Sequence, residues 1–197
     1  MQSVTYQVDG GHLASRKAAL LRPFLAVPVV IVVGLYALLQ LIIWPFSALL
    51  LFLRRERTMG DLERARSFVS MCSNWTAYLI LLSDQWPPKA VRIRFSYSPL
   101  VSRFELIFRF FFGILLAFNA VIFGILEMPV WCLQWLHILF SGRRHPRLHK
   151  LLLIYFQFLL YARAYFWLGV DERPPLFPQG LIRALTPHSH VAHDGHL

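Results

Sequence analysis

Long apolar runs and short polar segments alternate along this chain. The apolar runs cover residues 24–53, 67–83, 106–140 and 148–170. The first and third runs exceed the ~20 residues that span a bilayer. Each also holds a proline close to a tryptophan, at Pro45 and Pro129, so each is expected to tilt or to kink near that proline. The pattern predicts an all-α integral membrane fold with four transmembrane helices.

The second and fourth runs are more polar than the others. They carry residues such as Asn74 and Gln157, which lipid cannot satisfy, so these two helices are expected to face protein. Two further segments alternate apolar and polar positions, at 4–8 and 91–97. That period of two predicts short extramembrane strands that pair with each other.

The two halves of the chain resemble each other. AYLILLSDQWPP at 77–88 aligns with AYFWLGVDERPP at 164–175 after a shift of 87 residues, and the same shift pairs Trp44 with Trp131. We therefore predict two tandem two-helix repeats, 1–88 and 89–178, followed by a disordered His-rich tail at 179–197. An even number of spans in each repeat predicts that both repeats have the same orientation.

Composition supports a lipid environment. Hydrophobic residues make up 57% of the chain and charged residues only 15%, against about 25% charged in soluble domains; the mean hydropathy is +0.52. The net charge of +10 comes largely from loops between the apolar runs, where arginine is expected to contact anionic lipid. The predicted membrane-surface residues are Arg54, Arg55, Arg57, Arg143, Arg144 and Arg147. Outside the apolar runs no segment is long enough for a nucleic-acid-binding module.

Repeated motifs carry a family resemblance. They are the pairs Ser15–Arg16 and Ser102–Arg103, the later Arg22 and Arg109, the loop FSGRRHP at 140–146, and the endings LSDQWPP at 82–88 and VDERPPLF at 170–177. With these motifs the chain resembles a bacterial membrane family known as domain of unknown function 4389, in a tandem two-copy form. The resemblance implies an integral membrane unit in a bacterial inner membrane and brings no catalytic residue. The first copy departs from it with FLRRERT in place of FSGRRHP.

Polar side chains at membrane depth are the first candidate site. Glu127 and Arg163 lie deep in apolar runs at similar expected depths, and the shift of 87 places Gln40 and Thr76 at the matching positions. Two structural intramembrane polar pairs are predicted, because an unpaired charge in lipid is costly. Two alternatives remain open, namely separate solvation of Glu127 and Arg163 near the interface and an ion or proton pathway.

The ends of the second and fourth runs share an aspartate followed by two prolines. These predicted helix-end motifs are Asp84 with Pro87 and Pro88, and Asp171 with Pro174 and Pro175. Proline prevents a helix from continuing, so a helix stop is expected there. The alternative is that the two aspartates form a paired acid site.

The C-terminal tail is the only candidate for metal binding. Its histidines are His188, His190, His193 and His196. They lack cysteine and hydrophobic context, so we expect a solvated tail, no resident metal and no cofactor. Phosphate-binding glycine loops, nucleophile elbows and zinc-protease motifs are absent from the sequence, so an enzyme is not expected.

The sequence therefore favours a membrane accessory or scaffold protein over catalysis. We expect it to pack against a larger membrane complex or to form a homo-oligomer, in contact with anionic lipids and without nucleic acid. The alternative is a transport or lipid-handling protein that acts as an oligomer, suggested by the duplication and by the polar residues at membrane depth.

Overall fold

The computed structural model describes residues 4–8, 14–85, 87–95, 102–168 and 170–178. Within these residues the chain is mostly helical, and its elements are β1 (Val4–Val8), α1 (Arg16–Arg54), α2 (Met59–Leu79), β2 (Val91–Phe95), α3 (Arg103–Ser141) and α4 (Pro146–Phe166). The mostly helical class and the two predicted strands are confirmed. The polar start of each long run is also helical, so α1 and α3 begin earlier than the apolar pattern indicated.

Every element of the second half lies 87 residues after an element of the first half. The shift holds for both bounds of β1 and β2, of α1 and α3, and of α2 and α4. It also relates the left-handed residues that follow the helices, because Arg55 corresponds to Gly142 and Leu81 to Leu168. The backbone thus repeats more closely than the sequence does.

The strands pair antiparallel around one central pair of residues. In this register Tyr6 lies opposite Ile93 and Val4 opposite Phe95. The side chains of Val91 and Ile93 are buried, whereas Arg92 and Arg94 are exposed, as the alternating pattern predicted. The buried pair joins residues of α2 and α4, such as Val69 and Phe156, in the main hydrophobic core.

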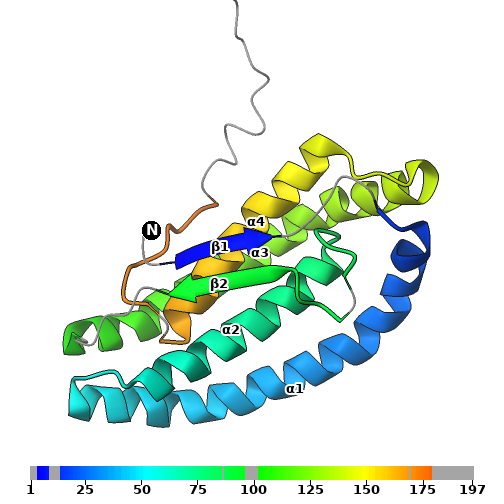
Figure 1. Ribbon diagram of the computed structural model, residues 1–197. Helices are drawn as coiled ribbons and strands as arrows, with labels where there is room; N and C mark the ends of the chain where they lie inside the picture. Colours follow the sequence, from blue (N-terminus) through cyan, green and yellow to red (C-terminus); the bar gives the residue numbers. More distant parts are fainter. Residues whose placement is uncertain (1–3, 9–13, 86, 96–101, 169, 179–197) are drawn as a thin grey trace, which may run out of the picture.

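Polar bonds fix the sheet to the helix beneath it. The side chain of Asn74 on α2 accepts a 2.8 Å hydrogen bond from the Val91 amide and donates a 3.3 Å bond to the Val91 carbonyl. In Figure 1 the sheet lies across α2 and α4, α1 curves along the outer side of α2, and α3 lies behind α4. Polar Asn74 therefore faces protein, as predicted for this helix.

The two long helices run in opposite directions. Arg16 at the start of α1 donates a 2.9 Å hydrogen bond to the carbonyl of Phe140 near the end of α3. Arg103 at the start of α3 donates a 3.2 Å bond to the carbonyl of Phe52 near the end of α1. The long helices are therefore antiparallel to each other and not parallel, as two membrane-crossing repeats of equal orientation would require, since each long helix starts beside the end of the other.

Two of the described helices, α1 and α3, are long and apolar enough to cross a membrane. Both have 39 residues and continue through Pro45 and Pro129, and α1 is curved (Figure 1). At 1.5 Å per residue each helix is about 58 Å long. The helices α2 and α4 have 21 residues each and bury much more of their surface in the protein.

Candidate functional site: two arginine–aspartate clusters

The first cluster lies near the start of α1. The guanidinium of Arg22 donates to the carbonyl of Ser83 at 2.7 Å and forms an ion pair with Asp84. Arg144, in the turn between α3 and α4, approaches the same carboxylate at 2.9 Å. The Arg22 guanidinium also lies over the ring of Tyr78, 4.6 Å from its centroid. One aspartate thus holds two arginines from different parts of the chain.

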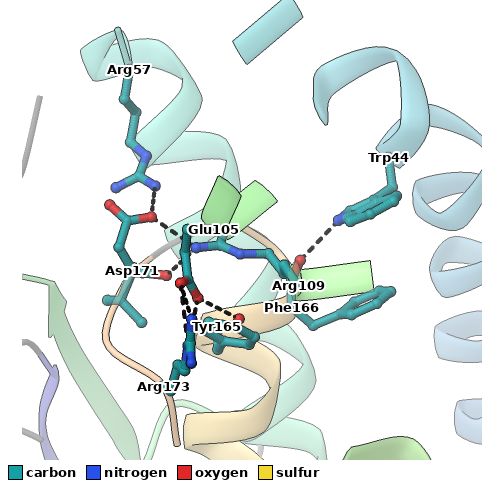
Figure 2. A network of polar contacts seen from close by, with 9 residues as sticks. Trp44, Arg57, Glu105, Arg109, Tyr165, Phe166, Asp171 and Arg173 are labelled. Carbon is teal, nitrogen blue, oxygen red and sulfur yellow. Dashed lines mark hydrogen bonds and ion pairs between the residues drawn. The ribbon is translucent and has the colours of Figure 1, made fainter. Parts of the chain in front are cut away.

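The second cluster lies near the start of α3 and is drawn in Figure 2. Arg109 donates to the carbonyl of Val170 at 2.9 Å and to Asp171 at 2.8 Å. Arg57, in the turn after α1, donates to the same oxygen of Asp171 at 2.9 Å. The ring of Tyr165 lies under the Arg109 guanidinium at 4.6 Å. Each of these residues lies 87 positions after or before its counterpart in the first cluster.

The second cluster has an acidic extension. Glu105 accepts a 2.6 Å hydrogen bond from the Tyr165 hydroxyl and a 2.8 Å bond from Arg173. The hydrogen bond with Glu105 raises the pKa of Arg173 above its usual value. Arg173 also lies over the ring of Phe108, 3.9 Å from its centroid. The shift places Ala18 and Trp86 at the positions of Glu105 and Arg173, so the extension is specific to the second half.

Both clusters join the two halves of the chain. Asp84 binds Arg22 from its own half and Arg144 from the other, whereas Asp171 binds Arg109 from its own half and Arg57 from the other. The side chains of Arg22 and Arg109 are 1% and 0% exposed. Removing one partner of such a buried pair costs about 3–5 kcal/mol, because the remaining charge stays desolvated.

Two tryptophans make a reciprocal exchange between the halves. The indole nitrogen of Trp44 donates to the carbonyl of Phe166 at the end of α4, at 2.8 Å, as Figure 2 shows. The indole of Trp131 donates to the carbonyl of Leu79 at the end of α2, at 2.9 Å. Carbonyls at a helix end lack a partner within the helix, so each tryptophan satisfies the end of a helix in the opposite half.

Two of the predicted membrane-surface arginines are buried instead. Arg57 and Arg144 are only 2% and 4% exposed, because each reaches an aspartate of the other half. The other four, Arg54, Arg55, Arg143 and Arg147, are exposed. The sequence pattern did not distinguish these two buried arginines from the four exposed ones, because all six lie in strongly basic segments. The signal for it was present, since Arg57 and Arg144 are related by the shift of 87.

The aspartates do not end the helices. α2 ends at Leu79 and α4 at Phe166, five residues before Asp84 and Asp171. The turn is made by Leu81 and Leu168, which have φ values of 67° and 62°. The predicted helix-end prolines, Pro87, Pro88, Pro174 and Pro175, come later still, in the segments after each cluster. The helix-stop interpretation of these aspartates is therefore wrong, and their carboxylates bind arginine.

The alternative of a paired acid site is also wrong. Asp84 accepts a 2.9 Å hydrogen bond from the amide of Ser15, directly before α1. Asp171 binds Arg57, three residues after the end of α1. The two carboxylates therefore lie at opposite ends of a helix about 58 Å long. General acid–base work by two carboxylates requires both to reach one substrate bond.

The predicted ion pair between Glu127 and Arg163 is not among the ion pairs of the described residues. Arg163 instead donates a 2.8 Å hydrogen bond to Thr76, because α4 packs on α2. Glu127 lines two cavities of about 240 and 250 Å³, one beside Tyr155 and one beside Arg22. Gln40 lines a separate cavity of about 70 Å³ next to Trp44. The hydrogen bond of Arg163 therefore joins α4 to α2 and not α4 to Glu127 of α3.

The histidines considered as candidates for metal binding are all in the C-terminal tail. The tail histidines His188, His190, His193 and His196 lie outside the described residues. Among the residues that are described, no group of three or more histidine, cysteine, aspartate or glutamate side chains is placed to hold a metal ion.

Comparison with known proteins finds a family match over one segment of the chain. Residues 103–178 match the model described as Domain of unknown function (DUF4389). This segment contains α3, α4, Arg109 and Asp171. No curated protein and no solved structure matches the chain.

Proposed function

We propose that this chain, which carries a DUF4389 domain at residues 103–178, is a non-enzymatic integral membrane protein. Its role is that of an accessory or scaffold subunit that packs against a larger membrane complex. We further propose that it consists of two copies of one unit and lies in the inner membrane of a bacterium. The observation that carries the proposal is the apolar surface of α1 and α3.

That surface is continuous along both helices. Between Leu20 and Leu53 the charged residue of α1 is Arg22, which is buried. Between Ile107 and Leu136 of α3 the charged residues are Arg109 and Glu127, and neither is exposed. Monomeric soluble proteins rarely expose contiguous apolar patches larger than a few hundred Å². Lipid tails or the helices of a membrane partner are suited to cover such a surface.

The polar groups of the protein support a structural role. In both clusters the arginines and carboxylates bind each other and backbone carbonyls. Catalysis by a side-chain nucleophile requires a base within hydrogen-bond reach of it. In both clusters the carboxylates are already bound to arginine. The clusters are therefore suited to hold the two halves of the chain together.

The membrane contact in this proposal is made by α1 and α3. The other two helices bury their apolar side chains against each other and against the sheet, and so have little apolar surface left for lipid. A four-span arrangement would need lipid around α2 and α4 as well.

The proposal is tested by crosslinking in native membranes followed by purification in mild detergent. We expect the chain to resist extraction by alkaline carbonate and to co-purify with one membrane partner in a fixed ratio. Phe118→Glu, on the exposed face of α3, should abolish both results. Arg66→Gln changes an exposed side chain on α2 and should leave both results unchanged. A chain that is released by carbonate, or that purifies as a monomer from crosslinked membranes, contradicts the proposal.

Lipid handling is a second candidate, and one observation favours it. The two cavities at Glu127 are lined mainly by apolar side chains such as Phe123, Ile154 and Met128. Apolar clefts with few polar groups are typical ligand sites, and an oligomer could use them to carry lipid. Transfer of labelled phospholipid between liposomes, lost in Gly124→Phe, would support this function, and unchanged transfer rates with and without the protein would exclude it.

A further inference from the structure

A twofold axis relates the two halves of the chain, and contacts between equivalent residues of the two halves show where it lies. Tyr6 pairs with Ile93 in the sheet, and Thr76 contacts Arg163 between α2 and α4. In both pairs the partners are related by the shift of 87. A contact between equivalent residues lies on the twofold axis that exchanges them. The axis therefore passes through the centre of the sheet and between α2 and α4, and it is perpendicular to the antiparallel pair α1 and α3.

The length of the apolar surface is the first argument about this axis. Exposed apolar side chains extend along α1 from Leu20 to Leu53 and along α3 from Phe104 to Phe140. At 1.5 Å per residue these stretches are about 50 Å long. The hydrocarbon core of a bilayer is about 30 Å thick. An upright helix would leave much of its apolar surface in water, whereas a helix in the membrane plane keeps all of it in lipid.

The position of the sheet is the second argument. If α1 and α3 crossed the bilayer, the twofold axis would lie in the membrane plane, and the sheet on that axis would lie at mid-depth. Gln7, Arg92 and Arg94 are exposed on this sheet. An open two-stranded sheet with exposed arginines is strongly disfavoured in hydrocarbon, because lipid satisfies neither its backbone nor its charges.

The distribution of charge is the third argument. Exposed basic residues occur at both ends of the long helices, namely Arg16, Lys17, Arg143 and Arg147 at one end and Arg54, Arg55 and Arg103 at the other. A crossing arrangement would put similar positive charge on both sides of the membrane. Membrane proteins instead concentrate lysine and arginine on the cytoplasmic side. An axis along the membrane normal places both ends on one side.

We propose that the chain lies in a single anionic leaflet with its twofold axis along the membrane normal. The helices α1 and α3 lie in the acyl region, where a helix about 10 Å wide fits within one leaflet. The basic helix ends contact acidic headgroups, and the sheet faces the aqueous side. The inference rests on the proposed membrane function and adds the surface and the lipid class that it binds.

The test is labelling from one side of the membrane. Single cysteines are introduced in a Cys72→Ala, Cys132→Ala chain as Lys17→Cys, Arg54→Cys and Arg92→Cys, and sealed vesicles of known sidedness receive a membrane-impermeant maleimide. All three sites should label from the same side. Leu35→Cys, in the middle of α1, is the matched control and should label only after detergent. The alternates Arg147→Cys and Glu56→Cys report the same two helix ends if a first variant is not produced.

The possible results separate the two proposals. Labelling of the two helix ends from opposite sides overturns the single-leaflet orientation, and so does a cysteine at position 92 that labels from neither side. Loss of the chain from vesicles during an alkaline wash overturns the membrane function itself. Same-side labelling of both helix ends and of the sheet in a wash-resistant chain supports the orientation.

Discussion

Arg163 on α4 donates a 2.8 Å hydrogen bond to the hydroxyl of Thr76 on α2, and the two residues are separated by 87 positions. The same shift relates Trp44 to Trp131 and Arg57 to Arg144, and each of these residues contacts the opposite half. The two halves are therefore joined by contacts that are made twice, with the Arg163–Thr76 bond in the middle.

The central bond should have a measurable energy. Thr76→Val removes the acceptor with little change of shape, and we expect it to lower the free energy of unfolding in detergent by about 1.5–3 kcal/mol, as for a hydrogen bond to a charged group. A double-mutant cycle with Arg163→Met isolates the interaction. Additive effects of the two substitutions would show that the bond does not stabilise the fold.

The buried arginines should be much more important than an exposed one. Arg22→Gln leaves the carboxylate of Asp84 with one arginine fewer, and we expect a loss of about 3–5 kcal/mol. Arg64→Gln is the matched control, because Arg64 is 77% exposed and pairs with Asp61 on the same helix. The free energy of unfolding should fall by less than about 1 kcal/mol in Arg64→Gln. Equal midpoints of chemical unfolding for the two variants would contradict the structural role of the clusters.

The tryptophan exchange should be symmetric. Trp44→Phe and Trp131→Phe keep a ring but remove the indole donor, and each should cost about 1 kcal/mol, the net value of a neutral hydrogen bond. Because the two sites share no partner, the costs should add in the double variant. Thermal unfolding measured by circular dichroism checks this. A strongly unequal pair of effects would show that the two halves are not equivalent in stability.

Glycine should stabilise the residue that follows each long helix. Adding glycine at position 55 and removing it at position 142 should therefore have opposite effects on stability. Arg55 has a φ of 62°, a conformation that glycine adopts without strain, and its counterpart is Gly142 at 69°. Arg55→Gly should therefore stabilise the protein by about 0.5–1 kcal/mol. Gly142→Ala should destabilise it, because the added Cβ would also lie 3.3 Å from Nε of Arg16. A destabilising Arg55→Gly would indicate that Arg55 makes a contact that outweighs its strain.

The hydrophobic pattern predicted the elements better than their ends. Apolar runs and alternation identified four helices and two strands, because burial imposes those periods. The start of α2 was missed by eight residues. Thr58 and Asp61 form a capping box there, which extends the helix into a segment too polar to stand out by hydropathy. Among the helices that the structure describes, length and composition alone support a membrane span for α1 and α3.

The site was predictable in part. Repetition identified Arg22, Arg109, Asp84 and Asp171 as positions that the two halves share. It did not show that Asp84 binds Arg144 of the other half, because a contact between halves depends on their relative direction. The similar depths expected for Glu127 and Arg163 in the membrane led instead to a predicted interaction between these two residues. Once α1 and α3 run in opposite directions, equivalent residues such as Thr76 and Arg163 are the ones that can meet.

Polarised infrared spectroscopy on the wild-type chain tests the orientation most directly, because it requires no substitution. The chain is reconstituted in a supported bilayer that contains anionic phospholipid, and the amide I absorption is compared for light polarised in the membrane plane and along its normal. The amide I transition of a helix lies close to the helix axis, and α1 and α3 supply most of the helical residues. If α1 and α3 lie in the membrane plane, the absorption will be stronger for light polarised in that plane. Stronger absorption along the normal would show that the long helices cross the bilayer and would overturn the single-leaflet orientation.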